Sequence, residues 1–353
     1  MRIAQVAPLH EAVPPKLYGG TERVVSYLTE ELVALGHDVT LYASGDSITS
    51  ARLVASCDSA LRLDPQCLDT VVYHVLQLEA LMGEAATYDI IHFHTDYMHY
   101  PWARRALAPT VTTLHGRQDL NDLIPLYEEY GDIPLVSISN AQRLPIAHAN
   151  WVGTVYHGLP ETLYRVSPGP GRYLAFLGRF SPEKGFERAV EIASRAGLPL
   201  KVAAKCDPID RAYFDQVVRP LLNEPVVEYV GEIGEHEKAD FLGGAIALLF
   251  PIDWPEPFGL VLIESMACGT PVIAWPSGSV PELVDHGVTG FIVRSIEGAV
   301  DAADEARRLD RARVRATFER RFSARRMTQD YLRLYRRLIN AQPPIRPVFS
   351  RNG

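Results

Sequence analysis

Cysteines, long apolar runs and net positive charge are all scarce in this sequence, and each scarcity excludes a class of protein. The 353 residues include only four cysteines, without a CxxC pair or metal-ligand spacing, so we expect reduced thiols and a cytoplasmic protein. No apolar run approaches the roughly 20 residues that span a bilayer, and the N-terminal MRIAQVAPLH is too short for a signal peptide. The net charge of −8 argues against nucleic acid as the main partner.

A GxGxxG fingerprint is also missing after the first predicted strand, residues 2–7. A nicotinamide dehydrogenase would carry these glycines in a tight turn at this point, so we disfavour that class of enzyme. The chain has instead a longer loop, HEAVPPKLYGG, that ends in Gly19 and Gly20 before a helix that Thr21 can cap. Glycines at the start of a helix still suit the edge of a phosphate or a sugar.

The order of the predicted elements indicates two doubly wound α/β domains with parallel sheets. Residues 1–160 form the first domain, with predicted strands at 2–7, 38–43, 89–94, 110–114, 135–138 and 152–156. Residues 161–172 are rich in Pro and Gly and are predicted to be the linker. Residues 173–322 form the second domain, with strands at 173–177, 200–204, 226–230, 246–250 and 271–274 and helices near 183–196, 210–222, 235–243 and 260–267. Residues 323–340 are predicted to form a helix that packs back on the first domain, before an irregular tail at 341–353.

The stretch from 253 to 284 holds two carboxylates, Glu256 and Glu264, on either side of a loop that becomes a helix. Gly259 in this loop allows the backbone to approach a ligand without a Cβ in the way. The first amides of the helix lack intrahelical partners, so the helix start attracts an anion. The two carboxylates can accept hydrogen bonds from hydroxyl groups on either side of that anion. This pattern suits a ligand with a central diphosphate and hydroxyl-rich rings at both ends.

A second cluster, GRFSPEKG, follows the first strand of the second domain. Arg179 and Lys184 bracket a predicted helix start, where Ser181 is a plausible cap. Arg can hold a phosphate through its planar fork and Lys as a point charge. A surface salt-bridge pair is the alternative interpretation of these two cations.

GRFSPEKG, followed about 70 residues later by PEPFGLVLIESMACGTPVIA, resembles the retaining glycosyltransferases of family 4. YGGTERVV, LHG, VSISN and VYHG add weaker similarities, so the resemblance covers nearly the whole chain. The resemblance implies a GT-B fold, in which two Rossmann-like domains face each other across a cleft. It further implies a hexosyltransferase that uses a UDP-sugar, most simply UDP-glucose, without a metal ion.

The resemblance also assigns roles to individual residues. The implied catalytic residues are His115, Arg179, Lys184 and Glu256. The implied donor-binding residues are Gly19, Gly20, Arg179, Lys184, Ile233, Glu256, Phe258, Gly259, Leu260 and Glu264. Arg179 and Lys184 would bind the diphosphate, Glu256 the transferred sugar, Glu264 the ribose and Ile233 the nucleobase. The two glutamates would position the donor rather than act as the acid/base pair of a glycosidase.

Several alternatives remain open from the sequence. His92, His94 and His99 invite a metal site, because an HxH pair on a strand places both rings on one face, but no carboxylate or Cys partner accompanies them. A non-catalytic nucleotide-sugar-binding or regulatory protein is the alternative function. The first fifty residues are similar to bacterial proteins described as glucosyltransferases acting on a reduced pterin, but a lipid, glycan or other small-molecule acceptor fits equally. The arginine-rich segment from 307 to 337 is interpreted first as a solvated helical face and second as a weak peripheral membrane contact.

Overall fold

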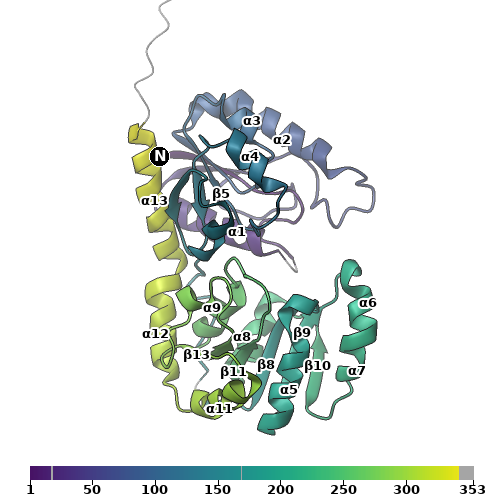
Figure 1. Cartoon of the computed structure of the whole chain (residues 1–353). Helices are drawn as coiled ribbons and strands as arrows, with labels where there is room; N and C mark the ends of the chain where they lie inside the picture. The colour runs from purple at the N-terminus through teal and green to yellow at the C-terminus, as the bar shows by residue number, and fades with distance from the viewer. Residues whose placement is uncertain (17–18, 168, 342–353) are drawn as a thin grey trace, which may run out of the picture.

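The computed structural model describes residues 1–16, 19–167 and 169–341, which fold into two α/β halves stacked one above the other (Figure 1). Every strand pairs in parallel with its neighbours. The predicted α/β architecture of two doubly wound, Rossmann-like sheets is therefore confirmed.

The first half is a seven-stranded sheet in the order β3-β2-β1-β4-β5-β6-β7. Its strands are β1 (Arg2–Val6), β2 (Asp38–Ala43), β3 (Arg52–Ala55), β4 (Ile90–Phe93), β5 (Thr110–Thr113), β6 (Leu135–Ser137) and β7 (Trp151–Thr154). Its helices are α1 (Gly20–Ala34), α2 (Thr70–Glu84), α3 (Tyr100–Ala103) and α4 (Leu123–Glu129), with 3₁₀ turns η1 (Ala85–Thr87) and η2 (Ala141–Ile146).

The second half is a six-stranded sheet in the order β10-β9-β8-β11-β12-β13. Its strands are β8 (Tyr173–Arg179), β9 (Leu200–Lys205), β10 (Val227–Gly231), β11 (Ala245–Phe250), β12 (Val272–Ala274) and β13 (Gly290–Ile292). Its helices are α5 (Phe186–Ala196), α6 (Arg211–Tyr213), α7 (Arg219–Leu221), α8 (Glu235–Gly243), α9 (Leu260–Ala267), α10 (Val280–Leu283), α11 (Ile296–Ala306) and α12 (Arg311–Phe322), with short turns η3 (Pro182–Lys184), η4 (Pro208–Asp210) and η5 (Phe214–Val218).

The strands that the sequence predicts lie in the interior of the two sheets or carry strongly apolar residues. All six residues of β11 are buried, as expected for a central parallel strand covered on both faces. The two strands that the sequence analysis missed, β3 and β13, are both edge strands of three or four residues. The edge position alone does not explain the miss, because the edge strands β7 and β10 were predicted. In addition, β3 is only partly buried and β13 has only three residues, so both have weak apolar patterns.

Two predicted helix starts are wrong. Thr21 does not cap the first helix, because α1 already begins at Gly20 and Gly19 occupies the cap position. The helix predicted at 183–196 is broken: a 3₁₀ turn ends at Gly185, whose φ of 68° is left-handed, and α5 begins only at Phe186. Ser181 makes no capping bond, and its hydroxyl oxygen is buried without a hydrogen-bond partner. The Pro182–Lys184 turn before the break carries Lys184, which lines the cavity described below.

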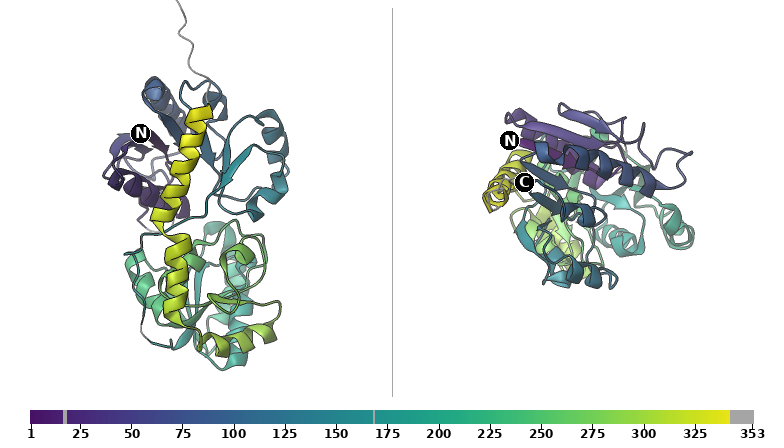
Figure 2. Two further views of the ribbon diagram at one scale, coloured as in Figure 1. Left: turned by 90° about the vertical axis from the view of Figure 1, so that its left-hand side faces the viewer. Right: turned by 90° about the horizontal axis from the view of Figure 1, so that it is seen from above.

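The last helix, α13 (Ala324–Ala341), runs alongside the first half, while α12 lies on the second (Figure 2). Tyr331, Leu334 and Tyr335 of α13 share an apolar cluster with Val24 and Leu28 of α1. The chain therefore crosses between the halves twice. The two crossings are hydrogen-bonded to each other, because the Leu159 amide donates to the Phe322 carbonyl at 2.9 Å. The domain boundaries remain a prediction, and the predicted tail beyond Ala341 lies outside the described residues.

The interpretation of the arginine-rich segment as one solvated face is wrong for about a third of its arginines, namely Arg311, Arg315, Arg321 and Arg326, which are partly buried. Arg311, Arg315 and Arg326 each donate hydrogen bonds to at least two backbone carbonyls of other segments, among them those of Ala245, Tyr164 and His157. These guanidiniums tie α12 and the start of α13 to the rest of the molecule, a use for which the planar fork of Arg is well suited. Exposed arginines of the segment are Arg307, Arg308, Arg313, Arg320, Arg325, Arg333, Arg336 and Arg337.

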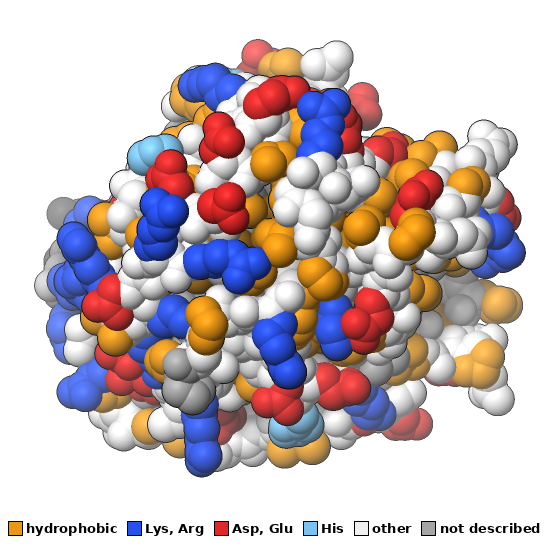
Figure 3. Space-filling model, turned by 90° about the horizontal axis from the view of Figure 1, so that it is seen from below, with side chains coloured by type: hydrophobic (Ala, Val, Ile, Leu, Met, Phe, Trp, Pro, Cys, Tyr) orange, Lys and Arg blue, Asp and Glu red, His pale blue; other side chains and the backbone are white. Residues whose placement is uncertain are grey.

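The surface carries both signs of charge. On the end of the molecule formed by the second half, Lys and Arg side chains alternate with Asp and Glu (Figure 3). Within the described part of the chain, no helix combines the length and the apolar character needed to cross a bilayer.

Candidate functional site

A cavity of about 450 Å³ lies between the two halves. The carboxyl ends of parallel strands, where open α/β sheets bind ligands, contribute much of its wall. All eleven of the residues that the sequence analysis nominates line this one cavity: Gly19, Gly20, His115, Arg179, Lys184, Ile233, Glu256, Phe258, Gly259, Leu260 and Glu264. The structure thus gathers the nominated residues, while the role of each in binding or catalysis remains a prediction.

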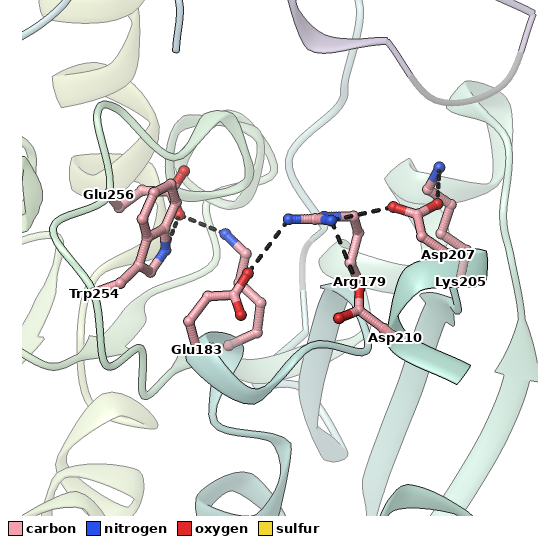
Figure 4. Close-up of polar contacts among 8 residues, drawn as sticks. Arg179, Glu183, Lys205, Asp207, Asp210, Trp254 and Glu256 are labelled. Carbon is pink, nitrogen blue, oxygen red and sulfur yellow. Dashed lines mark hydrogen bonds and ion pairs between the residues drawn. The ribbon is translucent and has the colours of Figure 1, made fainter. Parts of the chain in front are cut away.

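Arg179 ends β8 and lies among three carboxylates (Figure 4). Its guanidinium lies 3.1 Å from the Asp207 carboxylate, 3.4 Å from Glu183 and 3.9 Å from Asp210. Asp207 also pairs with Lys205 at 2.8 Å, and these cations hold the pKa of its carboxyl below the usual range despite partial burial. The carboxylates hold the guanidinium beside the cavity by contacts that a phosphate group could replace.

Lys184 forms a second charged pair at the same edge. Its ammonium contacts the Glu256 carboxylate, which also accepts a hydrogen bond of 2.9 Å from the indole N–H of Trp254 (Figure 4). The ammonium lies 5.1 Å from the centre of the Trp254 ring, within the range of a cation–π contact. Lys184 and Glu256 are 72 residues apart in the chain, so their pairing confirms that GRFSPEKG and the PEPFG loop meet in space.

The helix α9 begins inside the cavity. Gly259 precedes it with a φ of 80°, and an added Cβ there would come within 3.3 Å of side-chain atoms of Leu262 and Phe250. A glycine is thus required both by the left-handed backbone and by the close packing. The first amides of α9 lack intrahelical acceptors, and the positive end of its dipole faces the cavity.

Glu264 lies one turn into α9 and is only 4 % exposed. Its carboxylate pairs with the ammonium of Lys238, on α8, at 2.7 Å. Lys238 gives no signal in the sequence, because EHEKAD in α8 has the composition of an ordinary solvated helix. Each of the two nominated glutamates is therefore neutralised by a lysine, Glu256 by Lys184 and Glu264 by Lys238. A carboxylate held by an ammonium group can still accept hydrogen bonds from hydroxyl groups, because its two oxygens have several acceptor sites.

An ion pair joins the two halves beside this cluster. Arg23 on α1 contacts the Glu235 carboxylate at the start of α8, and the hydroxyl of Tyr164 also donates to Glu235. Arg23 and Glu235 are largely buried, so this pair is less screened than a surface pair. On the same side, Gly20 lies against Leu260, since an added Cβ would be 3.3 Å from the Leu260 side chain. The glycine loop of the first half thus lies directly on the start of α9.

Further polar residues line the cavity that the sequence analysis did not select. Glu22, in the first turn of α1, is buried, and burial raises the pKa of its carboxyl to about 7. Arg62 and Arg117 come from the first half and pair with Glu11 and Asp119 of that same half. Glu22 lies in the YGGTERVV segment, but its spacing in the sequence does not distinguish a residue that lines a cavity from a solvated one.

His115 follows β5 and lies against the ring of His157, with ring centres 5.2 Å apart. His157 in turn contacts Phe258 of the second half, with ring centres 4.7 Å apart. Burial lowers the pKa of His115 to about 3, so its ring is neutral at physiological pH. His157, in the VYHG segment, thus also lies in the wall of the cavity.

The three histidines that invited a metal site make hydrogen bonds within the first half instead. His92 bonds to Tyr335 and Thr113, and His99 bonds to Thr112 at 2.7 Å. His94 bonds to His115 at 2.8 Å. Across residues 1–16, 19–167 and 169–341, no group of three or more His, Cys, Asp or Glu side chains is arranged to hold a metal ion.

Comparison with known proteins agrees with this geometry. Residues 18–181 match the family model Glycosyltransferase Family 4, and residues 165–316 match the model Glycosyl transferases group 1. The chain is similar to N-acetyl-alpha-D-glucosaminyl L-malate synthase of Bacillus anthracis, with 24% identity over 90% of this chain and 93% of that protein.

Two solved structures share the fold. Sucrose-phosphate synthase from Thermosynechococcus elongatus superposes with a TM-score of 0.78 at 22% identity, over 97% of this chain and 100% of that one. Anabaena HepE, solved in complex with UDP-glucose, superposes with a TM-score of 0.70 at 17% identity, over 94% and 98% of the two chains.

The fold, the cavity and these matches define a glycosyltransferase with the GT-B fold. More specifically, the chain belongs to glycosyltransferase family 4. The prediction of an enzyme is confirmed, and the alternative of a non-catalytic binding protein is set aside.

Proposed function

We propose that this enzyme transfers a sugar, most simply glucose, from a UDP-sugar to a hydroxyl group of an acceptor, with retention of anomeric configuration. The single observation that carries the proposal is the gathering of Arg179, Lys184 and the start of α9 at one wall of the cavity. Three positive groups at one place suit a diphosphate leaving group. The likeness of the fold to HepE, which binds UDP-glucose, supports the choice of donor.

The charges of the second half define how the donor would be held. The diphosphate lies between Arg179, Lys184 and the amides of Phe258, Gly259 and Leu260, and it replaces some of the carboxylate contacts of Arg179. Glu256 accepts hydrogen bonds from the transferred sugar, and Glu264 accepts them from the ribose. Ile233, which lines the cavity beyond β10, packs against the nucleobase.

Transfer breaks the bond between the anomeric carbon and the diphosphate oxygen. The departing nucleoside diphosphate takes the bonding electron pair, and its growing negative charge is stabilised by the cations and the helix start that already surround it. The acceptor oxygen forms its new bond on the same face of the sugar, and its proton passes to the departing diphosphate. Neither glutamate is needed as a base, which agrees with the pairing of each glutamate to a lysine.

The proposal needs no divalent metal, because fixed cations neutralise the leaving group. Closure of the two halves on the donor would exclude water from the cavity. The cytoplasm, where nucleotide sugars are available, is the compartment that we propose. The acceptor is a small-molecule, lipid or glycan hydroxyl.

A panel of nucleotide sugars tests the donor. A ligand that binds only the folded state raises the melting temperature, so UDP-glucose should give the largest shift in the panel. Release of UDP in the presence of a metal chelator, and NMR of the anomeric proton of the product, then test metal independence and retention. A larger shift with a GDP- or ADP-sugar would overturn the donor, and loss of activity with EDTA that Mg²⁺ restores would overturn the metal-free mechanism.

A further inference from the structure

A chain of buried hydrogen bonds connects the last helix of the protein to the cavity. It begins at the hydroxyl of Tyr335 on α13, which accepts a bond of 3.1 Å from the side-chain Nε2 of Gln5 on β1. Gln5 Oε1 lies 2.8 Å from Nε2 of His94, and His94 Nδ1 lies 2.8 Å from Nε2 of His115. Tyr335 and Gln5 are fully buried and His94 is 2 % exposed, so water cannot substitute for these partners.

The polarity of this chain follows from which groups can donate. The amide of Gln5 donates through Nε2, so its Oε1 can only accept, and the proton between Gln5 and His94 must belong to His94 Nε2. A neutral His94 with its proton on Nε2 has a bare Nδ1. The proton between the two histidines must therefore belong to Nε2 of His115, which leaves Nδ1 of His115 as an unprotonated acceptor.

Both rings are neutral, as this assignment requires. Burial lowers the pKa of His94 well below its ordinary value, and neighbouring histidines lower it further. Burial likewise lowers the pKa of His115 to about 3.

Nδ1 of His115 is buried without a hydrogen-bond partner, although the residue lines the cavity. A bare ring nitrogen can accept a hydrogen bond from a hydroxyl group, whereas the other tautomer would present an N–H that only donates. The tautomer of His115 thus decides which hydrogen bond the first half can offer to a bound sugar.

We propose that Gln5, His94 and Tyr335 are positioning residues that hold His115 in the Nε2–H tautomer, so that its Nδ1 accepts a hydrogen bond from a hydroxyl of the transferred sugar. The hydrogen bond to the sugar rests on the proposed function above, whereas the tautomer of His115 follows from the hydrogen bonds alone. The arrangement gives α13 a part in the site although none of its residues lines the cavity. A segment some 220 residues beyond His115 in the chain thus controls a hydrogen bond made by that histidine.

Nitrogen NMR of the protein labelled with ¹⁵N-histidine, without any ligand, tests the tautomer directly. The expected spectrum shows His115 with a protonated Nε2 and an unprotonated Nδ1, assigned by comparison with His115→Gln. A protonated Nδ1 in the wild-type protein would overturn the proposal even if the enzyme transfers sugar. If the wild type shows the Nε2–H form but releases UDP from no donor, the proposed function fails while the tautomer assignment stands.

Two tyrosines of α13 provide a matched pair for testing this chain of hydrogen bonds. Tyr331 and Tyr335 are both fully buried, but Tyr331 bonds to Thr113 at 2.9 Å, whereas Tyr335 bonds to Gln5 and also, at 2.6 Å, to His92. Tyr335→Phe removes the acceptor that fixes the Gln5 amide, so we expect a mixed His115 tautomer and a fall in kcat of about tenfold with UDP affinity unchanged. Tyr331→Phe should leave the tautomer and kcat as in the wild type. Gln5→Leu, which removes the partner of His94, should match Tyr335→Phe.

Binding of UDP alone separates positioning from a general structural effect. UDP lacks the sugar, so a variant that affects only the His115 hydrogen bond should bind UDP as tightly as the wild type does. Equal losses of UDP affinity and of kcat in Tyr335→Phe and Tyr331→Phe would overturn the positioning role, as would a changed tautomer in Gln5→Leu with unchanged kcat.

Discussion

The two halves of the molecule present different side chains to the cavity between them. The second half supplies charged groups in pairs, with Lys184 on Glu256 and Lys238 on Glu264, while Arg179 lies among carboxylates. The nominated residues of the first half are two glycines and a neutral histidine. Of its arginines in the cavity wall, Arg62 and Arg117 pair within that half, and Arg23 pairs with Glu235 of the second half.

This difference indicates a division of work between the halves. Fixed charges are useful where charge develops, which in sugar transfer is the departing diphosphate. Neutral hydrogen-bonding groups and glycines are useful where an uncharged sugar must fit closely without a desolvation penalty. If the comparison holds, substitutions in the second half should act on the leaving group, and substitutions in the first should act on the sugar and on stability.

The largest expected effect is that of Lys184→Ala. The substitution removes a cation from the leaving group and leaves Glu256 without its ammonium partner, so kcat/KM for UDP release should fall by about 100-fold, or roughly 2.7 kcal/mol. Lys201→Ala is the matched control, because Lys201 pairs with Glu228 at 2.8 Å near the opposite end of the same sheet. Equal activity of the two variants would contradict a role of Lys184 in transfer.

Glu264→Ala should cost at least about tenfold in kcat/KM, or roughly 1.4 kcal/mol, since it removes a hydroxyl acceptor and leaves Lys238 with only its longer contact to Glu235 at 3.6 Å. Isothermal titration with UDP should show the same loss as the kinetics, because the ribose belongs to UDP. Glu319→Ala, at a carboxylate that pairs with Arg315 on α12, should bind UDP normally. Normal UDP affinity of the Glu264→Ala variant would contradict the proposal that Glu264 binds the ribose.

The neutral histidines of the first half predict a loss of stability in acid. Their folded-state pKa values lie below the ordinary 6.5, so the unfolded chain binds protons that the folded chain does not, and stability falls as the pH drops below 6.5. The residues concerned are His92, His94, His99, His115 and His157. Each contributes a slope of up to about 1.4 kcal/mol per pH unit. Glu22 opposes this trend, because burial raises its pKa from 4.5 to about 7. Between these two pH values the folded chain binds a proton at Glu22 that the unfolded chain does not bind.

Urea unfolding at pH 7.5, 6.5 and 5.5 measures this slope. His99→Gln removes one group whose pKa is lowered by burial, so the slope of the unfolding free energy against pH should fall by roughly 1.4 kcal/mol per pH unit. Stability that is constant from pH 7.5 to 5.5 would show that these histidines are not held neutral.

The smallest expected effect is an improvement. Asp207→Asn removes one of the carboxylates that compete with a phosphate for Arg179, so UDP should bind about two- to fivefold more tightly, as expected for a half-exposed pair worth roughly 0.5–1 kcal/mol. Asp215→Asn, in a pair with Arg211 on the distant α6, should leave UDP affinity unchanged. Weaker UDP binding in Asp207→Asn would mean that Asp207 orients Arg179 rather than competes for it.

Much of the fold could be predicted because parallel strands buried on both faces are continuous apolar segments. The central strands β1, β4, β8 and β11 were found in this way, whereas the short edge strands β3 and β13 were not. The start of α5 could not be found, because Ser181-Pro182 is a typical helix start and only the left-handed Gly185 delays the helix.

The nominated site residues were found because their motifs place special residue types at strand and helix ends. Lys238, Arg23 and Trp254 were missed because each is an ordinary residue type without a local pattern. Their importance comes from partners distant in the chain.

The sequence by itself determined the two sheets, the glycines before α1 and α9, and the charged residues at the ends of strands, since backbone conformation and burial depend on local residue types. Only the tertiary structure decided which charge neutralises which, and that a buried chain from α13 reaches His115. Such pairings depend on contacts between segments far apart in the chain, and no local spacing encodes them.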